Sequence, residues 1–307
     1  MSHLYVAVTD LDGLALGAGA PPWPLAARLL TRADRRVLGI PWREWVLAKA
    51  GLTVIGDGLP IAAQLAQAAG QVDVPTGGWW LASPLRLTPG MSHVQVDPRG
   101  LLTQSAATRQ QLVADFARSW PDPSVRLQDT PSGLLVAVSP ALRAHSVDPA
   151  SYAGRRLDEM TVTGPDAGAL LRLMTELQMW LHQRAIPSEQ GVDVNAFWLW
   201  GGGGGCVQGD AQWPVLASAD PWLQVLSTSQ PVLRCTDRIE TWSVQVALAS
   251  GTSWQEMEAQ WWRTLSIDLM RGQWQGAMIY LDGVEYQLSR RQWLRVWRRL
   301  RALGDRG

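Results

Sequence analysis

Two aspartates near the amino end, Asp10 and Asp12, are the first side chains whose types and spacing could do chemistry. They lie in the segment Thr9 to Gly13, and carboxylates in short glycine-containing turns are common ligands of divalent cations. Metal-dependent phosphotransfer needs several Asp and His ligands around an open position. No two of the four histidines are three or four residues apart, and His182 is the one we would add to Asp10 and Asp12. Because Asp-Gly turns are also common on surfaces, an ordinary turn is the simpler interpretation.

A run of five glycines at 201–205 follows a nearly all-apolar segment, Val194 to Trp200. Glycine loops at strand ends can hold a phosphate with their backbone N–H groups. No Lys-Ser/Thr pair follows the run, and the chain has no Gly-x-Ser-x-Gly nucleophile motif, so we favour a flexible or close-packed turn after a core strand. The single lysine, Lys49, falls in an expected helix, which leaves little scope for P-loop or Schiff-base chemistry.

Arginines crowd the carboxyl end, in a helix expected to run from a capping box at Ser289 and Gln292 to Leu303. Those we single out as a possible surface for an anionic partner are Arg291, Arg295, Arg298 and Arg299. An amphipathic helix of Arg and Trp can bind nucleic acid or an anionic membrane surface. The ordinary alternative is a packed terminal helix whose arginines are solvated or paired with acidic groups.

Composition narrows the class of protein. The chain has 307 residues, 47% of them hydrophobic and 18% charged, with 27 basic and 27 acidic side chains. That balance excludes a disordered chain and gives no global reason to expect nucleic acid as a partner. No uncharged run is long enough to span a membrane, and the amino end has no basic n-region, so we expect a cytoplasmic protein. The chain is rich in tryptophan, with 18 against two phenylalanines, and its two cysteines are isolated, which predicts neither a zinc site nor a disulfide framework.

Hydrophobic periodicity predicts a mixture of helices and strands. A strand is expected first, then three short helices, a strand–strand–helix–strand–strand block over 79–138, a long helix, a strand, another helix and a hairpin around Asp282-Gly283. The expected bounds outside that block are Leu4–Val8, Pro24–Ala33, Trp42–Ala50, Pro60–Ala69, Pro165–Arg184, Val194–Trp200, Trp254–Met270, Ala277–Tyr280 and Val284–Leu288. A connector rich in Pro and Gly at 139–160 suggests two parts, 1–150 with α+β character and 151–307 with α/β character.

The stretch 166–203 carries a recognisable pattern. Its helical part contains Glu176, Gln178, Met179, Leu181 and His182, and its strand and loop contain Val194, Asn195, Trp198, Trp200, Gly201, Gly202 and Gly203. This pattern resembles the RpfE-type regulatory proteins of proteobacteria, which are often described as similar to cofactor-independent phosphoglycerate mutases. Arg184 and Ala196 depart from it, because the family usually has histidine and serine there. Ser83 to Arg86 also replaces the family's Asp-Pro-Val-His type of strand.

The resemblance implies an α/β fold, a mixed layered sheet with flanking helices whose C-terminal half is similar to the alkaline phosphatase superfamily. It favours a non-catalytic regulatory or interaction protein that binds another protein and needs no cofactor. One alternative is a phosphoglycerate mutase-like or phosphatase-like metalloenzyme that holds a divalent metal with Asp10, Asp12 and His182. Another is a nucleic-acid-associated accessory protein that uses the arginine-rich terminal helix.

The polar residues of the matched stretch also allow a physical expectation. If the helix at 165–184 packs on the following strand, Glu176, Gln178 and Asn195 lie near a core and need hydrogen-bond partners. The loop N–H groups of 201–205 could satisfy Glu176 or Asn195. We therefore expect a structural clamp at this place or, as the alternative, the floor of a ligand pocket.

Overall fold

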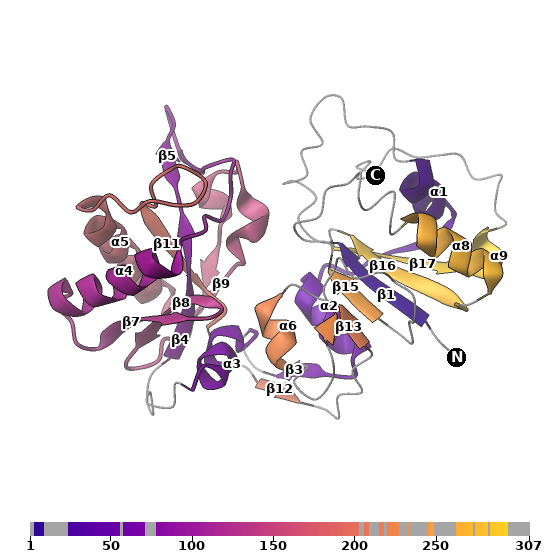
Figure 1. Ribbon diagram of the computed structural model, residues 1–307, viewed down its shortest axis with the longest axis horizontal. Helices are drawn as coiled ribbons and strands as arrows, with labels where there is room; N and C mark the ends of the chain where they lie inside the picture. Colours follow the sequence, from indigo (N-terminus) through magenta and orange to yellow (C-terminus); the bar gives the residue numbers. More distant parts are fainter. Residues whose placement is uncertain are drawn as a thin grey trace. The chain divides into compact units, whose positions relative to one another are not determined.

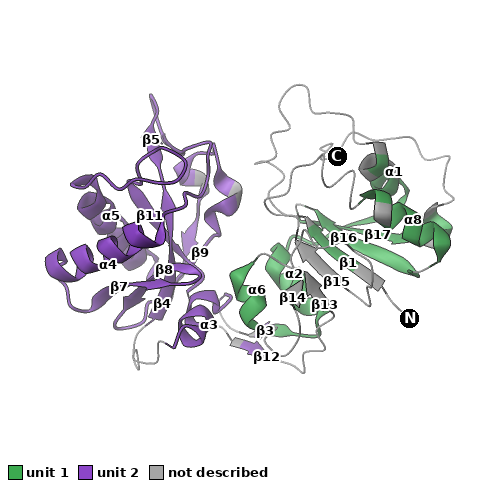
Figure 2. Cartoon of the chain, viewed as in Figure 1, with its two compact units in different colours: residues 1–53, 209–307 green, residues 54–208 purple. Residues whose placement is uncertain are grey.

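The structure is a computed structural model that describes residues 3–8, 24–55, 58–70, 78–202, 206–208, 215–217, 220–226, 232–233, 245–248, 262–272, 274–281 and 283–293 (Figure 1). The chain forms two compact units (Figure 2). Unit 1 comprises residues 1–53 and 209–307, and unit 2 comprises residues 54–208, so unit 2 is inserted within the sequence of unit 1.

This division differs from the expected boundary near residue 150. That position lies inside unit 2, where β9 (His145–Ser146) pairs with β10 (Val162–Thr163). Strands on either side of the connector also belong to one sheet, because β11 (Ala196–Trp200) pairs with β4 (Gly78–Leu85). A connector rich in Pro and Gly can therefore lie within a compact unit when strands pair across it.

Unit 1 is built on a seven-stranded sheet in the order β14-β13-β15-β1-β16-β17-β2. Pairing is parallel from β14 through β16, whereas β17 and β2 are antiparallel. The strands are β1 (His3–Val8), β2 (Asp34–Val37), β13 (Val215–Ala217), β14 (Val232–Leu233), β15 (Gln245–Leu248), β16 (Gly276–Leu281) and β17 (Val284–Ser289). The helices are α1 (Pro24–Arg32), α2 (Trp42–Lys49), α6 (Pro221–Leu226), α8 (Arg263–Arg271) and α9 (Arg290–Trp293). Helices α1 and α8 cover one face of the sheet and α2 the other (Figure 1), which confirms the expected α/β class.

Sequence signals located several elements of unit 1. The expected hairpin is present, because β16 pairs with β17, and Gly283 between them has the positive φ of +77° that such a turn needs. The capping box before α9 is confirmed, because the Ser289 N–H donates to Gln292 Oε1 at 2.6 Å and the Gln292 N–H donates to Ser289 Oγ at 3.4 Å. Strand β2 was not predicted. Its four residues are all exposed, so it has no apolar alternation, and it is ordered by pairing with β17.

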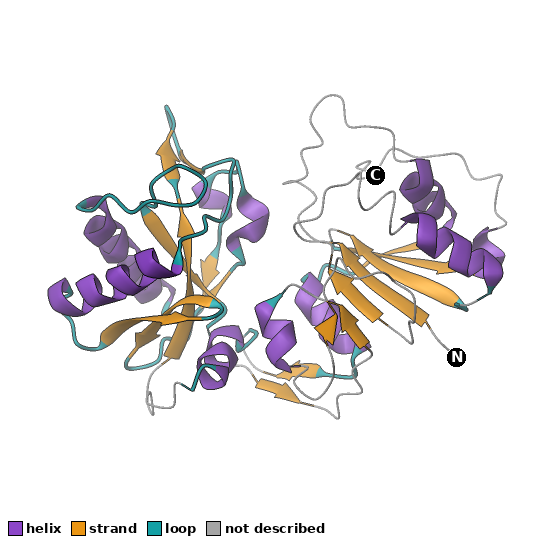
Figure 3. Ribbon diagram, viewed as in Figure 1, coloured by secondary structure: helices purple, strands orange, loops and turns teal. Residues whose placement is uncertain are grey.

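Unit 2 has a four-stranded antiparallel sheet in the order β11-β4-β8-β7. Its core follows the chain order β4, α4 (Ala106–Ser119), β7 (Val125–Thr130), β8 (Gly133–Val138), α5 (Ala167–His182), β11. This βαββαβ order with that strand arrangement is the ferredoxin-like topology. Helices α4 and α5 lie together on one face of the sheet (Figure 3).

The remaining elements of unit 2 surround this core. Helix α3 packs against β4, and β5 pairs with β6 in a short hairpin. The bounds are α3 (Ile61–Ala68), β5 (Leu87–Pro89), β6 (Val94–Val96), η1 (Pro149–Tyr152) and η2 (Leu157–Glu159). A separate two-stranded sheet consists of β3 (Thr53–Ile55) and β12 (Cys206–Gln208).

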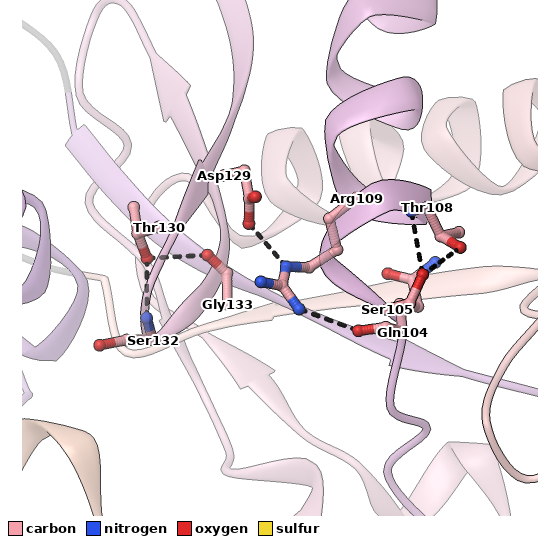
Figure 4. Close-up of polar contacts among 8 residues, drawn as sticks. All are labelled: Gln104, Ser105, Thr108, Arg109, Asp129, Thr130, Ser132 and Gly133. Carbon is pink, nitrogen blue, oxygen red and sulfur yellow. Dashed lines mark hydrogen bonds and ion pairs between the residues drawn. The ribbon is translucent and has the colours of Figure 1, made fainter.

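Helix α4 is anchored at its amino end and along the sheet (Figure 4). Ser105 caps it, because its Oγ accepts from the Thr108 N–H at 3.1 Å. The guanidinium of Arg109 donates to Asp129 on β7 at 2.6 Å and to the Gln104 carbonyl at 2.9 Å. These contacts attach the first turns of the helix to the β7–β8 hairpin.

Aromatic side chains join the carboxyl ends of α4 and α5. Phe116 stacks on Trp120 with ring centroids 4.7 Å apart, and Trp180 meets Phe116 edge-on at 5.1 Å. The Trp180 indole N–H also donates to Ser119 Oγ at 2.9 Å. Within the described residues, none of the helices has the length and apolar character to cross a bilayer.

Candidate functional site

Asn195 is the chain's single asparagine and stands directly before β11. Its Oδ1 accepts from the Leu87 N–H at 2.7 Å, and its Nδ2 donates to the Leu87 carbonyl at 2.8 Å. The Asn195 backbone N–H donates to the Leu85 carbonyl at 3.1 Å. The side chain thus continues the β11–β4 ladder past the point where β4 ends. Only a carboxamide supplies both the donor and the acceptor at this reach, because aspartate has no donor and serine is shorter.

The two tryptophans of the pattern are also held by internal partners. The Trp198 indole N–H donates to the Val147 carbonyl at 2.9 Å, and the Trp200 indole N–H donates to Ser83 Oγ at 2.7 Å. Both side chains are buried. Each ring therefore fills core volume while its N–H is satisfied, which fixes β11 against its neighbours.

The first glycines after β11 form a close-packed turn. Gly201 has a φ of +66°, and its carbonyl accepts from the Ala62 N–H in the first turn of α3 at 2.9 Å. A Cβ at Gly202 would lie 2.5 Å from the Trp80 ring and 2.6 Å from the Trp79 carbonyl oxygen. No side chain fits there, so close approach explains Gly202 without a phosphate. Gly203 lies outside the described residues.

The polar residues of α5 do not join this cluster. Glu176 and His182 are exposed and Gln178 is half-buried, whereas Leu177 and Leu181 are fully buried. The expectation that Glu176 lies near the core and takes a partner from the glycine loop was wrong. Its α-helical position, one residue before the buried Leu177, directs it about 100° away from that residue and outward.

The exposed side of α5 forms a continuous surface, which we call the outer α5 face: Gly168, Leu171, Arg172, Thr175, Glu176, Met179 and His182. Two large apolar side chains belong to it, with Leu171 45% exposed and Met179 66% exposed. The Thr175 hydroxyl donates to the Leu171 carbonyl at 2.9 Å, so it is already satisfied within the helix. Across the described ranges, neither Arg172 nor Glu176 makes an ion pair.

The metal hypothesis receives no support from the residues that the structure describes. Among them, no three His, Cys, Asp or Glu side chains come together in a way that could hold an ion. Asp10 and Asp12 lie outside the described residues. Of the terminal arginines, Arg291 is exposed at the start of α9, and the other three, Arg295, Arg298 and Arg299, are likewise not described.

Sequence reasoning missed a charged pair in unit 1. The Lys49 Nζ on α2 lies 2.7 Å from Glu285 Oε2 on β17, and the Trp45 indole N–H donates to the same oxygen at 2.6 Å. Burial pushes the pKa of the Glu285 carboxyl upward, but the hydrogen bonds from Lys49 and Trp45 outweigh it and hold the pKa below its usual value. The Lys49 ammonium also lies 5.3 Å from the Trp45 ring and 5.8 Å from the Tyr5 ring. The rarity of lysine was the only sequence signal, and it did not indicate the partner.

No protein-family model and no curated protein matches the chain. Among solved structures, it is similar to the cofactor-independent phosphoglycerate mutase from Thermoplasma acidophilum DSM 1728. The sequence identity is 14%, the match covers 94% of this chain and 89% of that chain, and the TM-score is 0.32. A likeness at this TM-score supports no conclusion about this chain, and the resemblance to RpfE-type proteins remains an expectation from the sequence.

Proposed function

We propose that this chain is a non-catalytic interaction protein of a regulatory kind, as its RpfE-type resemblance implies, and that it binds another protein through the outer α5 face. In this proposal the strand and loop of the matched stretch are scaffolding. The helix that precedes them carries the contact surface.

One observation carries the proposal: the polar groups of the matched stretch do not face a common point. Asn195 and the indoles of Trp198 and Trp200 are used by internal partners. Glu176 and His182 lie on the exposed side of α5. A catalytic centre needs reacting groups that converge, whereas a binding surface needs groups that project outward.

The chemistry of the outer α5 face fits a protein partner. Met179 is flexible and polarizable, and such side chains adapt well to an apolar partner surface. Together with Leu171 it offers apolar contact, and Arg172 and Glu176 supply charges at the border. Apolar anchors with a charged border are the usual anatomy of a protein–protein contact.

The proposal also includes the fold expected for the C-terminal half, which is similar to that of the alkaline phosphatase superfamily. Strands β13, β15 and β16 come from that half, and they complete their parallel sheet with β1 from the amino end. A shared layered architecture need not bring a metal site with it, because function depends on the residues grafted onto a fold.

Site-specific photo-cross-linking tests the proposal. A photoreactive phenylalanine analogue is placed at Met179 of the full chain in the native host, and a matched control carries it at Ala117, which is exposed on α4. We expect discrete protein adducts from position 179 and none from position 117. Equal adducts at both positions, or none at 179, would count against an interaction surface on α5.

Metal analysis separates the metalloenzyme alternative. Stoichiometric zinc or manganese in the purified protein, with phosphate-ester turnover that Asp12→Asn abolishes, would replace the proposed function by an enzymatic one. Salt-dependent binding to single-stranded nucleic acid, lost on deletion of 290–307, would instead support the accessory role.

A further inference from the structure

We infer that the outer α5 face binds a second copy of this chain, with the two α5 helices antiparallel around a two-fold axis near Thr175. This inference rests on the proposed function and names its partner. It follows from how the exposed residues are distributed along the helix.

The outer α5 face has a middle row and two flanks. At about 100° per residue, Gly168, Thr175, Met179 and His182 lie within about 60° of one another around the helix, which places them in the middle row. Arg172 and Glu176 form one flank. Leu171 forms the other flank, and the half-buried Gln178 lies next to it at the edge of the face.

An antiparallel two-fold arrangement sets like flanks against each other. Arg172 then faces Glu176 of the second copy, and Glu176 faces Arg172 of the second copy, so the two-fold axis produces two equivalent ion pairs. The midpoint of that pairing lies within one residue of Thr175, whose short side chain permits close approach. Charge complementarity of this kind selects the orientation of a contact more than its strength.

The middle row fits the same register. Met179, the more exposed of the two large apolar side chains, lies within one residue of Gly168 of the second copy when Arg172 meets Glu176. A long flexible side chain can pack into the space that a small residue leaves on the opposite helix. Apolar and charged contacts therefore agree on one register.

A parallel arrangement is disfavoured by the same residues. A two-fold axis along the helices would place Arg172 and Glu176 against the flank of Leu171 and Gln178, which carries no opposite charge. The ion pairs would be lost, and two charges would be set against an apolar side chain.

The expected complex is weak and reversible. One pair of helices covers less surface than a stable protein–protein interface needs, so dimerisation should depend on protein concentration. The ion pairs lie at the border and are screened by salt, so added salt should weaken the dimer.

Charge reversal with rescue tests the inference on the full chain. Sedimentation over a wide range of concentration should show a monomer–dimer equilibrium. Each single variant, Arg172→Glu or Glu176→Arg, disturbs two symmetric pairs and should raise the dissociation constant roughly tenfold. The double variant carrying both changes should recover the original association, and Ala117→Glu on α4 should leave it unchanged.

Disulfide trapping tests the geometry. In a chain with Cys206→Ser and Cys235→Ser, Thr175→Cys should oxidise to a covalent dimer, and Ala117→Cys should not. A monomer at every concentration, or a dimer indifferent to both reversals, would overturn the inference. A monomer whose position 179 still cross-links to another protein removes this inference and keeps the proposed function, whereas a monomer without adducts removes both.

Discussion

The two units keep their interior polar groups satisfied in different ways. In unit 1 the carboxylate of Glu285, on the antiparallel strand β17 of the mixed sheet, is buried and is held by an ammonium and an indole. In unit 2 the polar group that we compare with it is the neutral carboxamide of Asn195, which pairs with backbone groups. The comparison teaches that unit 1 depends on a charge that protons can remove, whereas this clamp of unit 2 has no titratable group.

The largest expected effect is in unit 1. Lys49→Ala leaves Glu285 buried without its cation and should lower the free energy of unfolding by about 3 kcal/mol. The double variant Lys49→Met with Glu285→Gln should lose less, since it removes both charges and retains an acceptor for Trp45. The loss of unfolding free energy in each variant is measured by urea unfolding, with hydrogen exchange as the probe of each unit. A double variant no better than Lys49→Ala would show that the uncompensated charge is not the cause.

A smaller loss is expected in unit 2. Asn195→Ala should destabilise that unit by about 2 kcal/mol, because it leaves the Leu87 N–H and carbonyl without their partner. Asn195→Asp retains the shape but places a carboxylate against the Leu87 carbonyl, so it should be at least as damaging at neutral pH. Thermal unfolding of the full chain reports both. An unchanged melting temperature together with altered ligand binding would instead assign Asn195 to a pocket.

We expect the two units to lose stability at different pH values in acid. The pKa of Glu285 is lowered in the folded state, so its contribution to stability is complete above its usual value of 4.5 and is lost as pH falls through the folded value. In unit 2, burial raises the pKa of Asp97, but hydrogen bonds from Arg99 outweigh it and hold that pKa below its usual 3.8, so its loss begins at lower pH. Hydrogen exchange in an acid titration should therefore show unit 1 weakening first. Glu285→Gln should abolish that order, and a persisting order would contradict this assignment.

The smallest expected effect concerns the outer α5 face. Glu176→Ala and His182→Ala should each change the free energy of unfolding by less than about 0.5 kcal/mol, because both side chains are exposed. Their melting temperatures should match that of the natural chain while cross-linking from position 179 changes. Substantial destabilisation by either variant would give that residue the structural role that the sequence first suggested.

Local sequence signals predicted much of the fold. The β16–β17 hairpin, the capping box at Ser289, the hairpin of β7 and β8 and the long helix α5 all follow from periodicity and turn chemistry within a few residues. The apolar spacing of that helix agrees with the structure, in which Leu177 and Leu181 are both fully buried. These features depend on residues that are close in the sequence, so they can be predicted from the sequence alone.

The candidate site was predicted only in part. The sequence pattern identified Asn195 and the glycine turn but not their partners. Asn195 pairs with Leu87, 108 residues earlier, and Gly202 lies against Trp80. Glu176 was placed near the core although the helix turns it outward. The expected boundary near residue 150 missed the insertion of unit 2 into the sequence of unit 1.

By itself the sequence determined the residue types, their periods and their turns, and hence many of the helices and strands. Only the tertiary structure decided that Lys49 meets Glu285, that Asn195 meets Leu87 and that strands from both ends of the chain share one sheet. The physical reason is that periodicity arises from hydrogen bonds and side-chain packing within a few residues. Pairing between distant segments depends instead on the free energy of the whole packed core, which no local pattern encodes.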